Sequence, residues 1–467
     1  AINPFDIKVG LTRPLQSEKT QMVAFLTALL TPAELTEPYE GTQGFVNFLV
    51  ERMFDSIQEV GENATPNIYQ YEQNSDLDRY LIDNDIVKYN VQHNGLPNYY
   101  DPERVTYFAL VRVLHQRGEQ FPDNSIERSK AWRARDLAHR LAMPLLGTLN
   151  NILTAPATVE LYTNVISTGE TMPRYAIRAI GEATAAYPCF AHYTKFDVDT
   201  ARVVALDLQE VLDKNNRKQS SLFLQIARMI GVKKISLTKE DIDSDVIPEI
   251  FKPYYRQQLE NLNTDRKVLA IDEMHNAKGD KTLMELLEVD AREGRKWGLE
   301  LIFASQNLSD FDFEEDNIKV KLLAYVTHLC VCSMPAASDL DSFRRYFSSS
   351  KLIENDMAGI RLSEHGLTYL SFIKAKSKKY CSLMTLAVGN KLLWALTTDA
   401  DDRLIRGFMD ELTNDRSLSR AALAYYFGSG AKKRIGEMRE QAKQNNRRLT
   451  NDQINSQTDN EVKLLAD

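Results

Sequence analysis

The chain has 467 residues, of which 43% are hydrophobic and 26% are charged, and its formal net charge is −8 at pH 7. This is an ordinary globular composition, and the chain is long enough for two to three domains. The acidic balance gives no global indication of nucleic-acid binding, and no apolar run reaches the length of a membrane span. Four cysteines at irregular spacing favour a reducing compartment.

The chain opens on AINPF with Ala1, in the middle of a pattern, so we expect it to be the carboxyl-terminal part of a longer protein. An extended segment with two prolines should precede a helix capped by Ser17. The apolar side of that helix is Met22, Val23, Phe25, Leu26, Leu29 and Leu30. We assign residues 1–36 to the first piece of an α/β core.

Residues 37–195 show almost only the 3.6-residue period of helices, which predicts an all-helical insertion. One predicted helix is basic, with Arg128, Lys130, Arg133, Arg135 and Arg140. These cations either form a contact surface for an acidic partner or nucleic acid, or a solvated face balanced by Glu127 and Asp136. The nearby acids favour the solvated face.

The α/β pattern resumes in residues 196–412. The segment VVALDL, within residues 202–208, predicts a buried strand. Asp207, near the end of this strand, either lies close to a ligand or caps the following loop, and we favour the cap. Apolar strands are expected at 268–271, 299–304 and 325–332, and a β-hairpin from 367–373 and 380–388. His328, Cys330 and Cys332 alternate on one of these strands, which we interpret as a buried strand rather than a metal site. Residues 413–467 should be a helical and then polar tail.

Polar side chains follow two of the predicted strands. Asp272 and Glu273 come directly after Val268–Ile271, and Gln306 follows Leu299–Ala304. In nucleotide-hydrolysing sites an Asp at a strand end holds Mg²⁺, a neighbouring carboxylate activates water, and an amide orients that water or registers the γ-phosphate. The pair alone also fits a strand that simply ends in a loop, but the full three-part order favours phosphoryl transfer. We therefore predict Asp272 as the metal holder, acting through water, Glu273 as the base and Gln306 as the sensor.

A phosphate-binding loop of the form Gly-x-x-x-x-Gly-Lys-Ser/Thr does not occur in the sequence. Residues 279–282, GDKT, imitate the end of such a loop but lie downstream of Asp272. The loop therefore either precedes this chain in a longer protein or never existed, and the opening in mid-pattern favours the first explanation.

Four separated segments, INPF, VLAIDEMH, EGRKWGLELIFASQ and LLWALTTDADDRLIR, resemble in sequence and order the large assembly ATPases of type IV secretion and conjugation systems, above all the Dot/Icm type. The resemblance is weaker over residues 37–195. It implies a RecA-like P-loop NTPase core with a mainly parallel sheet and a helical insertion, a homo-hexamer, and ATP and Mg²⁺ as cofactors. It also implies a cytoplasmic protein held peripherally at the inner membrane by secretion-complex components and other secretion ATPases.

By the same resemblance, Asp272 and Glu273 match the acidic strand end and Gln306 the sensor. A basic cluster before the second strand, Arg292, Arg295 and Lys296, matches the position from which a neighbouring subunit supplies a guanidinium group. Arg295 is the first candidate and Arg292 the second. An equally good interpretation is a helix end whose cations complement the helix dipole.

Three functions follow from these patterns. The first is an ATP-hydrolysing hexameric motor that energises assembly of a secretion system or translocation of its protein substrate. The second is a non-catalytic hub that docks another secretion ATPase. The third is a DNA-translocating conjugation motor, against which the acidic overall charge weighs.

Overall fold

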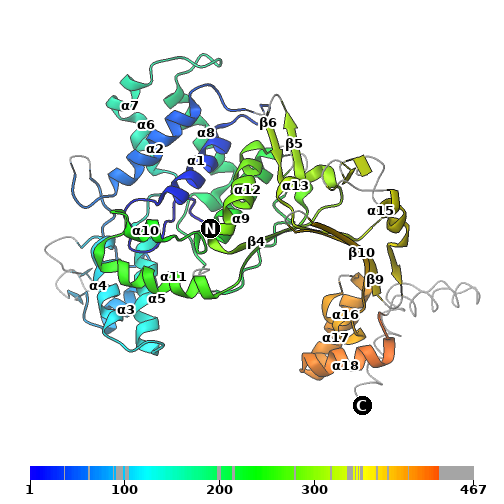
Figure 1. Ribbon diagram of the computed structural model, residues 1–467. Coiled ribbons are helices and arrows are strands. Elements are labelled where there is room, and N and C mark those ends of the chain that lie inside the picture. Colours follow the sequence, from blue (N-terminus) through cyan, green and yellow to red (C-terminus); the bar gives the residue numbers. More distant parts are fainter. Residues whose placement is uncertain are drawn as a thin grey trace, which may run out of the picture. The chain divides into compact units, whose positions relative to one another are not determined.

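The computed structural model describes residues 1–35, 37–61, 64–87, 89–90, 98–99, 105–196, 201–212, 216–277, 280–315, 318–333, 340–341, 343–344, 347, 351–363, 366–375, 378–397 and 399–430. The chain forms two compact units, Ala1–Tyr325 and Val326–Asp467 (Figure 1). Their boundary lies inside the range 196–412 that the sequence assigned to one core, and the four-part division of the chain stays a prediction.

The first unit contains most of the helices. Its α-helices are α1 (Gln16–Leu30), α2 (Thr42–Ser56), α3 (Ser75–Asp83), α4 (Tyr107–Glu119), α5 (Ile126–Ala142), α6 (Thr148–Thr154), α7 (Pro156–Leu161), α8 (Met172–Ala186), α9 (Arg217–Lys233), α10 (Lys239–Asp243), α11 (Lys252–Thr264), α12 (Lys281–Glu293) and α13 (Leu322–Tyr325). Single 3₁₀ turns are η1 (Pro188–Phe190), η2 (Glu249–Phe251), η3 (Met274–Asn276), η4 (Gly294–Trp297) and η5 (Leu308–Phe311). The strands are β1 (Tyr89–Asn90), β2 (Asn98–Tyr99), β3 (Lys267–Ile271), β4 (Leu299–Phe303), β5 (Asp312–Glu315) and β6 (Ile318–Lys321). The predicted insertion therefore carries α2–α8 but also the short antiparallel pair β1–β2.

Helix α1 begins one residue earlier than predicted, and Ser17 is not its cap. The residue before the helix is Leu15, which has no side-chain acceptor. The buried carboxylate of Glu18 replaces a cap, because it accepts the backbone N–H of Leu15 at 2.9 Å and that of Lys8 at 2.8 Å. The predicted apolar side of α1 is buried as expected.

One hydrophobic core joins three stretches of the first unit. The rings of Phe25 in α1 and Phe190 in η1 meet edge to face at 5.5 Å, and Phe190 contacts Phe223 of α9 at 5.0 Å. Buried side chains of α2–α8 belong to the same cluster. The helical region therefore shares its core with the amino-terminal segment and with α9–α11.

The basic helix, α5, is only in part the solvated face that the sequence favoured. Lys130 and Arg133 are exposed, whereas Arg135 and Arg140 are 1% and 9% exposed. Arg135 pairs with Asp136 at 2.8 Å and lies over the rings of Trp132 and Tyr254. A guanidinium group can be buried when a carboxylate and aromatic faces surround it. The positions of the charged residues in the sequence do not show that these partners surround Arg135.

His115 of α4 lies beside this buried guanidinium. Its Nδ1 accepts a hydrogen bond from Arg135 at 3.1 Å, and its Nε2–H donates to the carbonyl of Ile250 at 3.2 Å; these roles follow because arginine only donates and a carbonyl only accepts. Burial first, and then the charges of Arg135 and Arg128, lower the pKa of His115 to about 4. The ring is therefore held neutral in the folded chain.

The first unit should lose stability as the pH falls from about 6.5 to 4. The pKa of His115 is lower in the folded chain than in the unfolded chain, so the unfolded chain binds a proton first as the pH falls. The stabilisation is therefore complete above about pH 6.5 and is lost as the pH falls from there to about 4. We expect this group alone to contribute roughly 2–3 kcal/mol between pH 7.5 and 4.5. Urea unfolding at both pH values measures it, and His115→Gln should show a correspondingly smaller difference between them. An unchanged difference in His115→Gln contradicts the assignment.

The sheet of the first unit is much smaller than predicted. β3 and β4 form a parallel pair from Lys267↔Leu299 to Ile271↔Phe303, while every other paired strand that the structure describes runs antiparallel to its partner. The expectation of a mainly parallel sheet is therefore wrong for the described residues. The chain is a mixed helix-and-strand protein with one small parallel sheet.

The segment VVALDL is not a strand. Val203 is 88% exposed and Val204 is 41% exposed, so the predicted burial is also wrong. Asp207 accepts the backbone N–H of Gln209 at 3.0 Å, which agrees with its predicted capping role. A strand needs a neighbouring strand to pair with as well as an apolar sequence, and no strand in the described part of the chain pairs with this segment.

The second unit is built on an antiparallel sheet in the order β10–β9–β7, with β8 also paired to β9. The strands are β7 (His328–Val331), β8 (Arg361–Ser363), β9 (Gly366–Ala375) and β10 (Lys378–Leu386), and the helices are α15 (Lys351–Asp356), the 3₁₀ turn η6 (Met357–Gly359), α16 (Asn390–Leu396), α17 (Ala400–Thr413) and α18 (Arg416–Phe427). The register Lys378↔Ala375 confirms the predicted hairpin. The strand predicted around His328 is present as β7, but Cys330 and Cys332 are exposed, so its predicted burial is wrong. The sulfur of Cys330 lies 3.8 Å from Nε2 of His328.

Candidate functional site

Three predicted site residues lie at one edge of the β3–β4 pair. Asp272 and Glu273 directly follow β3, and Gln306 comes three residues after β4. Two backbone hydrogen bonds join the two strand ends: Ala304 N–H donates to Ile271 at 3.0 Å, and Met274 N–H donates to Ala304 at 3.0 Å. The parallel register therefore brings the predicted metal holder, base and sensor to the same carboxyl edge, where all three are exposed.

Glu273 has a left-handed backbone, with φ 55° and ψ 49°. This conformation costs a non-glycine residue about 1–2 kcal/mol. It is held by hydrogen bonds on both sides, because Glu273 N–H donates to Oδ1 of Asp272 at 2.9 Å and the Glu273 carbonyl accepts Asn276 N–H at 2.9 Å. The chain thus turns sharply between the strand and η3, directly at the two acids.

His275 is a site residue that the sequence reasoning missed. Its Nδ1 lies 2.8 Å from Oε2 of Glu273. The spacing of two residues in DEMH was the available signal, but in an extended chain this spacing says nothing about a contact, and the left-handed turn at Glu273 could not be read from the sequence.

Asp310 shapes the loop that carries Gln306. This carboxylate is 3% exposed, accepts the hydroxyl of Ser305 at 2.7 Å and accepts Asn307 N–H at 3.2 Å. It therefore fixes the residues on both sides of Gln306.

The backbone of both predicted arginines lies at the end of the β3–β4 pair opposite to the two acids. Helix α12 starts beyond the carboxyl edge of β3 and ends next to η4, at the amino edge of the pair, where Lys267 Nζ donates to the Trp297 carbonyl at 2.6 Å. Arg292 lies in the last turn of α12, is 57% exposed and has Glu293 at 3.7 Å. Arg295 belongs to η4, and its side chain lies outside the described residues, as does that of Lys296. The assignment of both arginines stays a prediction.

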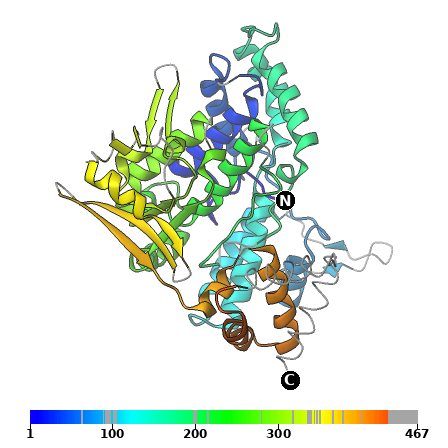
Figure 2. The same ribbon diagram turned by 90° about the vertical axis from the view of Figure 1, so that its right-hand side faces the viewer.

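The start of α12 is fixed against α9. Asp280 caps α12 by accepting Leu283 N–H at 3.0 Å, and its other oxygen accepts hydrogen bonds from Ser221 and, at 3.3 Å, from Gln225. The stretch GDKT is thus a helix start in this chain, with Gly279 itself outside the described residues. Further along, α9 and α12 lie side by side in Figures 1 and 2 and are joined by the buried pair Arg228–Asp290.

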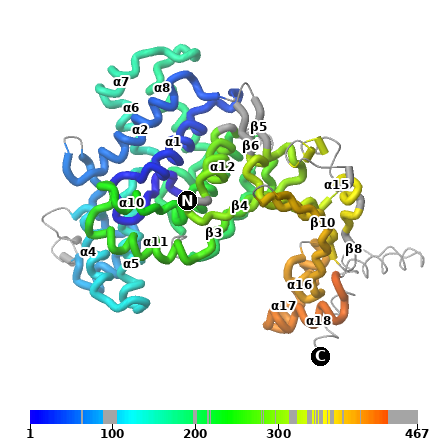
Figure 3. The backbone as a smooth tube through the Cα atoms, in the orientation of Figure 1, coloured from blue at the N-terminus to red at the C-terminus, as the bar shows by residue number. Residues whose placement is uncertain are grey.

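A groove of about 900 Å³ begins at η3 and runs between α1, α9 and α12. His275 and Asn276 line the end that adjoins the acidic edge. The course of α1 and α12 can be followed in Figure 3. The opposite wall carries mainly small and polar side chains of α1, including Thr20, Ala24 and Thr27.

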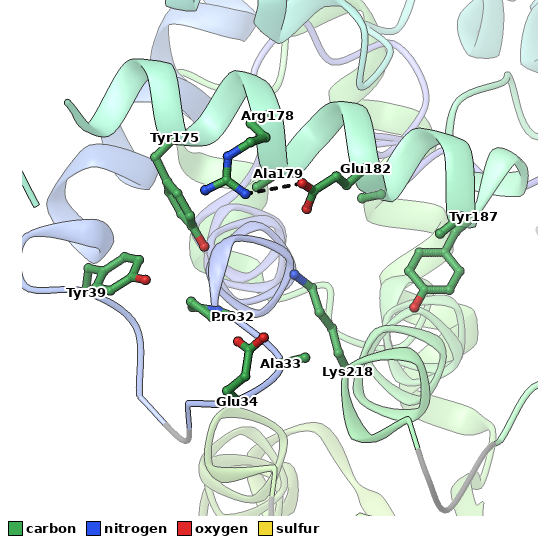
Figure 4. Close-up of a pocket in the computed structure, with 12 residues that line it drawn as sticks. Pro32, Ala33, Glu34, Tyr39, Tyr175, Arg178, Ala179, Glu182, Tyr187 and Lys218 are labelled. Atoms are coloured by element: carbon green, nitrogen blue, oxygen red, sulfur yellow. Dashed lines mark hydrogen bonds and ion pairs between the residues drawn. The ribbon is translucent and has the colours of Figure 1, made fainter. Parts of the chain in front are cut away.

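A second cavity, of about 390 Å³, lies between the end of α1, α8 and the start of α9 (Figure 4). Arg178 in its wall is already bonded to Glu182 at 3.2 Å and lies over the ring of Tyr175. Lys218 points into the cavity; burial lowers its pKa, while the carboxylates of Glu182 and Glu34 act in the opposite direction. The lining thus holds as many carboxylates as cations, which gives it no preference for an anion.

No group of three or more His, Cys, Asp or Glu side chains is arranged to hold a metal ion among the residues that the structure describes. A nucleotide-bound Mg²⁺ needs only one or two carboxylates, because phosphates and waters complete its shell. Asp272 alone therefore fits a metal of this kind. Within the same residues, no helix has the length and apolar character to cross a membrane.

No family model, curated protein or solved structure matches the chain. Its functional assignment therefore depends on the strand edge and the motifs described above.

Proposed function

We propose that this chain contains the RecA-like ATPase core of a hexameric motor that hydrolyses ATP in a type IV, Dot/Icm-like secretion system, to energise its assembly or the translocation of protein substrate. The observation that carries the proposal is the parallel register of β3 and β4, which brings Asp272, Glu273 and Gln306 to one exposed carboxyl edge. Ligands of α/β sheets bind at that edge.

Each residue has one task in the proposed reaction. Asp272 holds Mg²⁺ through water, Glu273 accepts a proton from the attacking water, and Gln306 contacts that water or the γ-phosphate. Bound ATP would supply the electrophilic γ-phosphorus, and Mg²⁺ would neutralise negative charge on the phosphate oxygens. Phosphoryl transfer needs positioning and charge more than covalent chemistry, and these three side chains can contribute both once the nucleotide is bound.

Arg295, with Arg292 as the second candidate, would act on the site of a neighbouring subunit. Their backbone position at the amino edge of β3–β4 supports this, because the acids Asp272 and Glu273 follow the opposite, carboxyl end of β3. In such an assembly the protein is cytoplasmic and attached peripherally to the inner membrane through secretion-complex components and other secretion ATPases.

A second candidate function is a non-catalytic hub that docks another secretion ATPase. It is favoured by the absence of Gly-x-x-x-x-Gly-Lys-Ser/Thr from all 467 residues. A DNA-translocating motor has less support, since Arg135 and Arg140 of the basic helix are buried and Arg128 is paired with Glu119 and Asp123.

The proposal is tested by measuring ATP hydrolysis and oligomeric state in the same samples of the full-length protein, with and without Mg²⁺. We expect hydrolysis that requires Mg²⁺ and appears only in the oligomer. The 467-residue chain alone should bind ATP weakly, since the phosphate-binding loop is not in it. Rings that form without hydrolysing ATP would favour the hub, and tight ATP binding by the 467-residue chain would place the phosphate site elsewhere.

A further inference from the structure

We propose that His275 is a positioning residue for Glu273: its Nδ1–H holds one carboxylate oxygen so that the other faces the attacking water. This inference rests on the proposed function, because it adds a residue to the same site. The contact between the imidazole of His275 and the carboxylate of Glu273 can be tested even if the protein hydrolyses no ATP.

The first support is the position of the ring nitrogen. Nδ1 of His275 lies 2.8 Å from Oε2 of Glu273, and it is buried without a well-aligned hydrogen-bond partner among the described residues. The two atoms are thus within hydrogen-bond distance but not yet in hydrogen-bond alignment. Catalytic hydrogen bonds are often poorly aligned before substrate binds and tighten in the substrate complex.

The second support is the backbone, which builds this contact. The left-handed conformation of Glu273 turns the chain so that a side chain two residues later returns to the carboxylate. Met274, between them, is fully buried, and its N–H is bonded to Ala304 of the neighbouring strand end. A strained turn that is held at both ends keeps the two side chains together, and strain of this kind is concentrated at functional sites.

The third support is chemical. A glutamate that acts as a base needs one oxygen free for the proton of water, while its other oxygen is best fixed by a donor. In the proposed step, one proton of water goes to Oε1 of Glu273 and the hydroxide oxygen bonds to the γ-phosphorus. The bond from this phosphorus to the β–γ bridging oxygen breaks, giving ADP and phosphate. His275 exchanges no proton in this step and acts only through Glu273.

The test compares His275→Leu, which removes the donor, with His275→Asn, whose amide nitrogen takes the place of Nδ1. In the full-length protein we expect His275→Leu to lower kcat about 10- to 100-fold with the KM for ATP unchanged within about twofold, because a misplaced base affects the chemical step and not binding. His275→Asn should recover most of kcat. Asn276→Ala, on the same turn and lining the same groove, is the matched control and should behave as the wild type.

Two results overturn the inference: wild-type kcat in His275→Leu, or an equal loss in His275→Leu and His275→Asn. Because His275→Leu could lower kcat by disturbing the turn, a second measurement is independent of turnover. The ¹⁵N shifts of the His275 ring at pH 8.5 report which nitrogen carries the proton. We expect the proton on Nδ1 in the wild type and its transfer to Nε2 in Glu273→Ala, which lacks the acceptor.

These two measurements separate the inference from the proposed function. A protein that hydrolyses no ATP but shows the tautomer change would contradict the motor and retain the His275–Glu273 contact. A protein that hydrolyses ATP but shows the same tautomer in both forms would retain the motor and exclude the positioning role.

Discussion

Glu273→Gln should lower kcat for ATP hydrolysis by about 10²- to 10⁴-fold while ATP remains bound. The amide has the size of the carboxylate but cannot accept a proton, so the attacking water loses its base. The groups that would hold the nucleotide, including Asp272 with its Mg²⁺, are unchanged. Steady-state turnover of the full-length protein gives kcat, and equilibrium binding of a fluorescent ATP analogue shows whether the nucleotide is retained.

Glu300→Gln is the matched control for this substitution. Glu300 lies near the amino edge of the same sheet, in β4, and pairs only with exposed Arg266 in the described part of the chain. Its replacement should leave kcat unchanged. Normal turnover in Glu273→Gln would remove Glu273 from the role of base, and a loss of ATP binding together with turnover would indicate a folding or metal-binding defect.

Asp290→Asn should destabilise the first unit by about 3–5 kcal/mol. Asp290 and Arg228 are 1% and 5% exposed and form two hydrogen bonds, at 2.6 and 2.8 Å, that join α12 to α9. Burial raises the pKa of Asp290 although Arg228 opposes the shift, so the carboxylate has given up much of its hydration. Neutralising it leaves a buried guanidinium without its counter-charge. Urea unfolding at pH 7 measures the loss.

Two further variants separate the charge from the packing. Arg266→Gln breaks an exposed pair, Arg266–Glu300, and should change the free energy of unfolding by less than about 1 kcal/mol. The double variant Arg228→Met with Asp290→Leu replaces both charges by apolar side chains and should recover much of the stability lost in Asp290→Asn. A loss below about 1 kcal/mol in Asp290→Asn would mean that water reaches the pair.

The features that the sequence predicted correctly are local. β3 and β4 are short apolar runs with polar residues directly behind them, and the edge formed by Asp272, Glu273 and Gln306 follows once the two strands are adjacent and parallel. The β9–β10 hairpin has its two strands beside one another in the chain. In each case the information needed lies within about 40 residues.

The features that could not be predicted depend on distant partners or on single torsion angles. VVALDL has a strand-like pattern, but pairing requires another strand that no local pattern specifies. Arg135 is buried because Trp132 and Tyr254 surround it, and Tyr254 comes from α11, more than a hundred residues away. The contact of His275 with Glu273 depends on one left-handed residue, which the sequence does not mark.

The single core of the first unit has a consequence for synthesis on the ribosome. The hydroxyl of Tyr255 donates to the carbonyl of Val9 at 2.6 Å across a separation of 246 residues, and Lys8 reaches Ser236 across 228. At 5–20 residues per second, the first segment waits roughly 10–50 s for these partners to be made. During that time Phe5, Ile7 and Leu11, all fully buried in the finished chain, have no complete core to enter. The nascent chain therefore presents them to chaperones and to other nascent chains on the same messenger RNA.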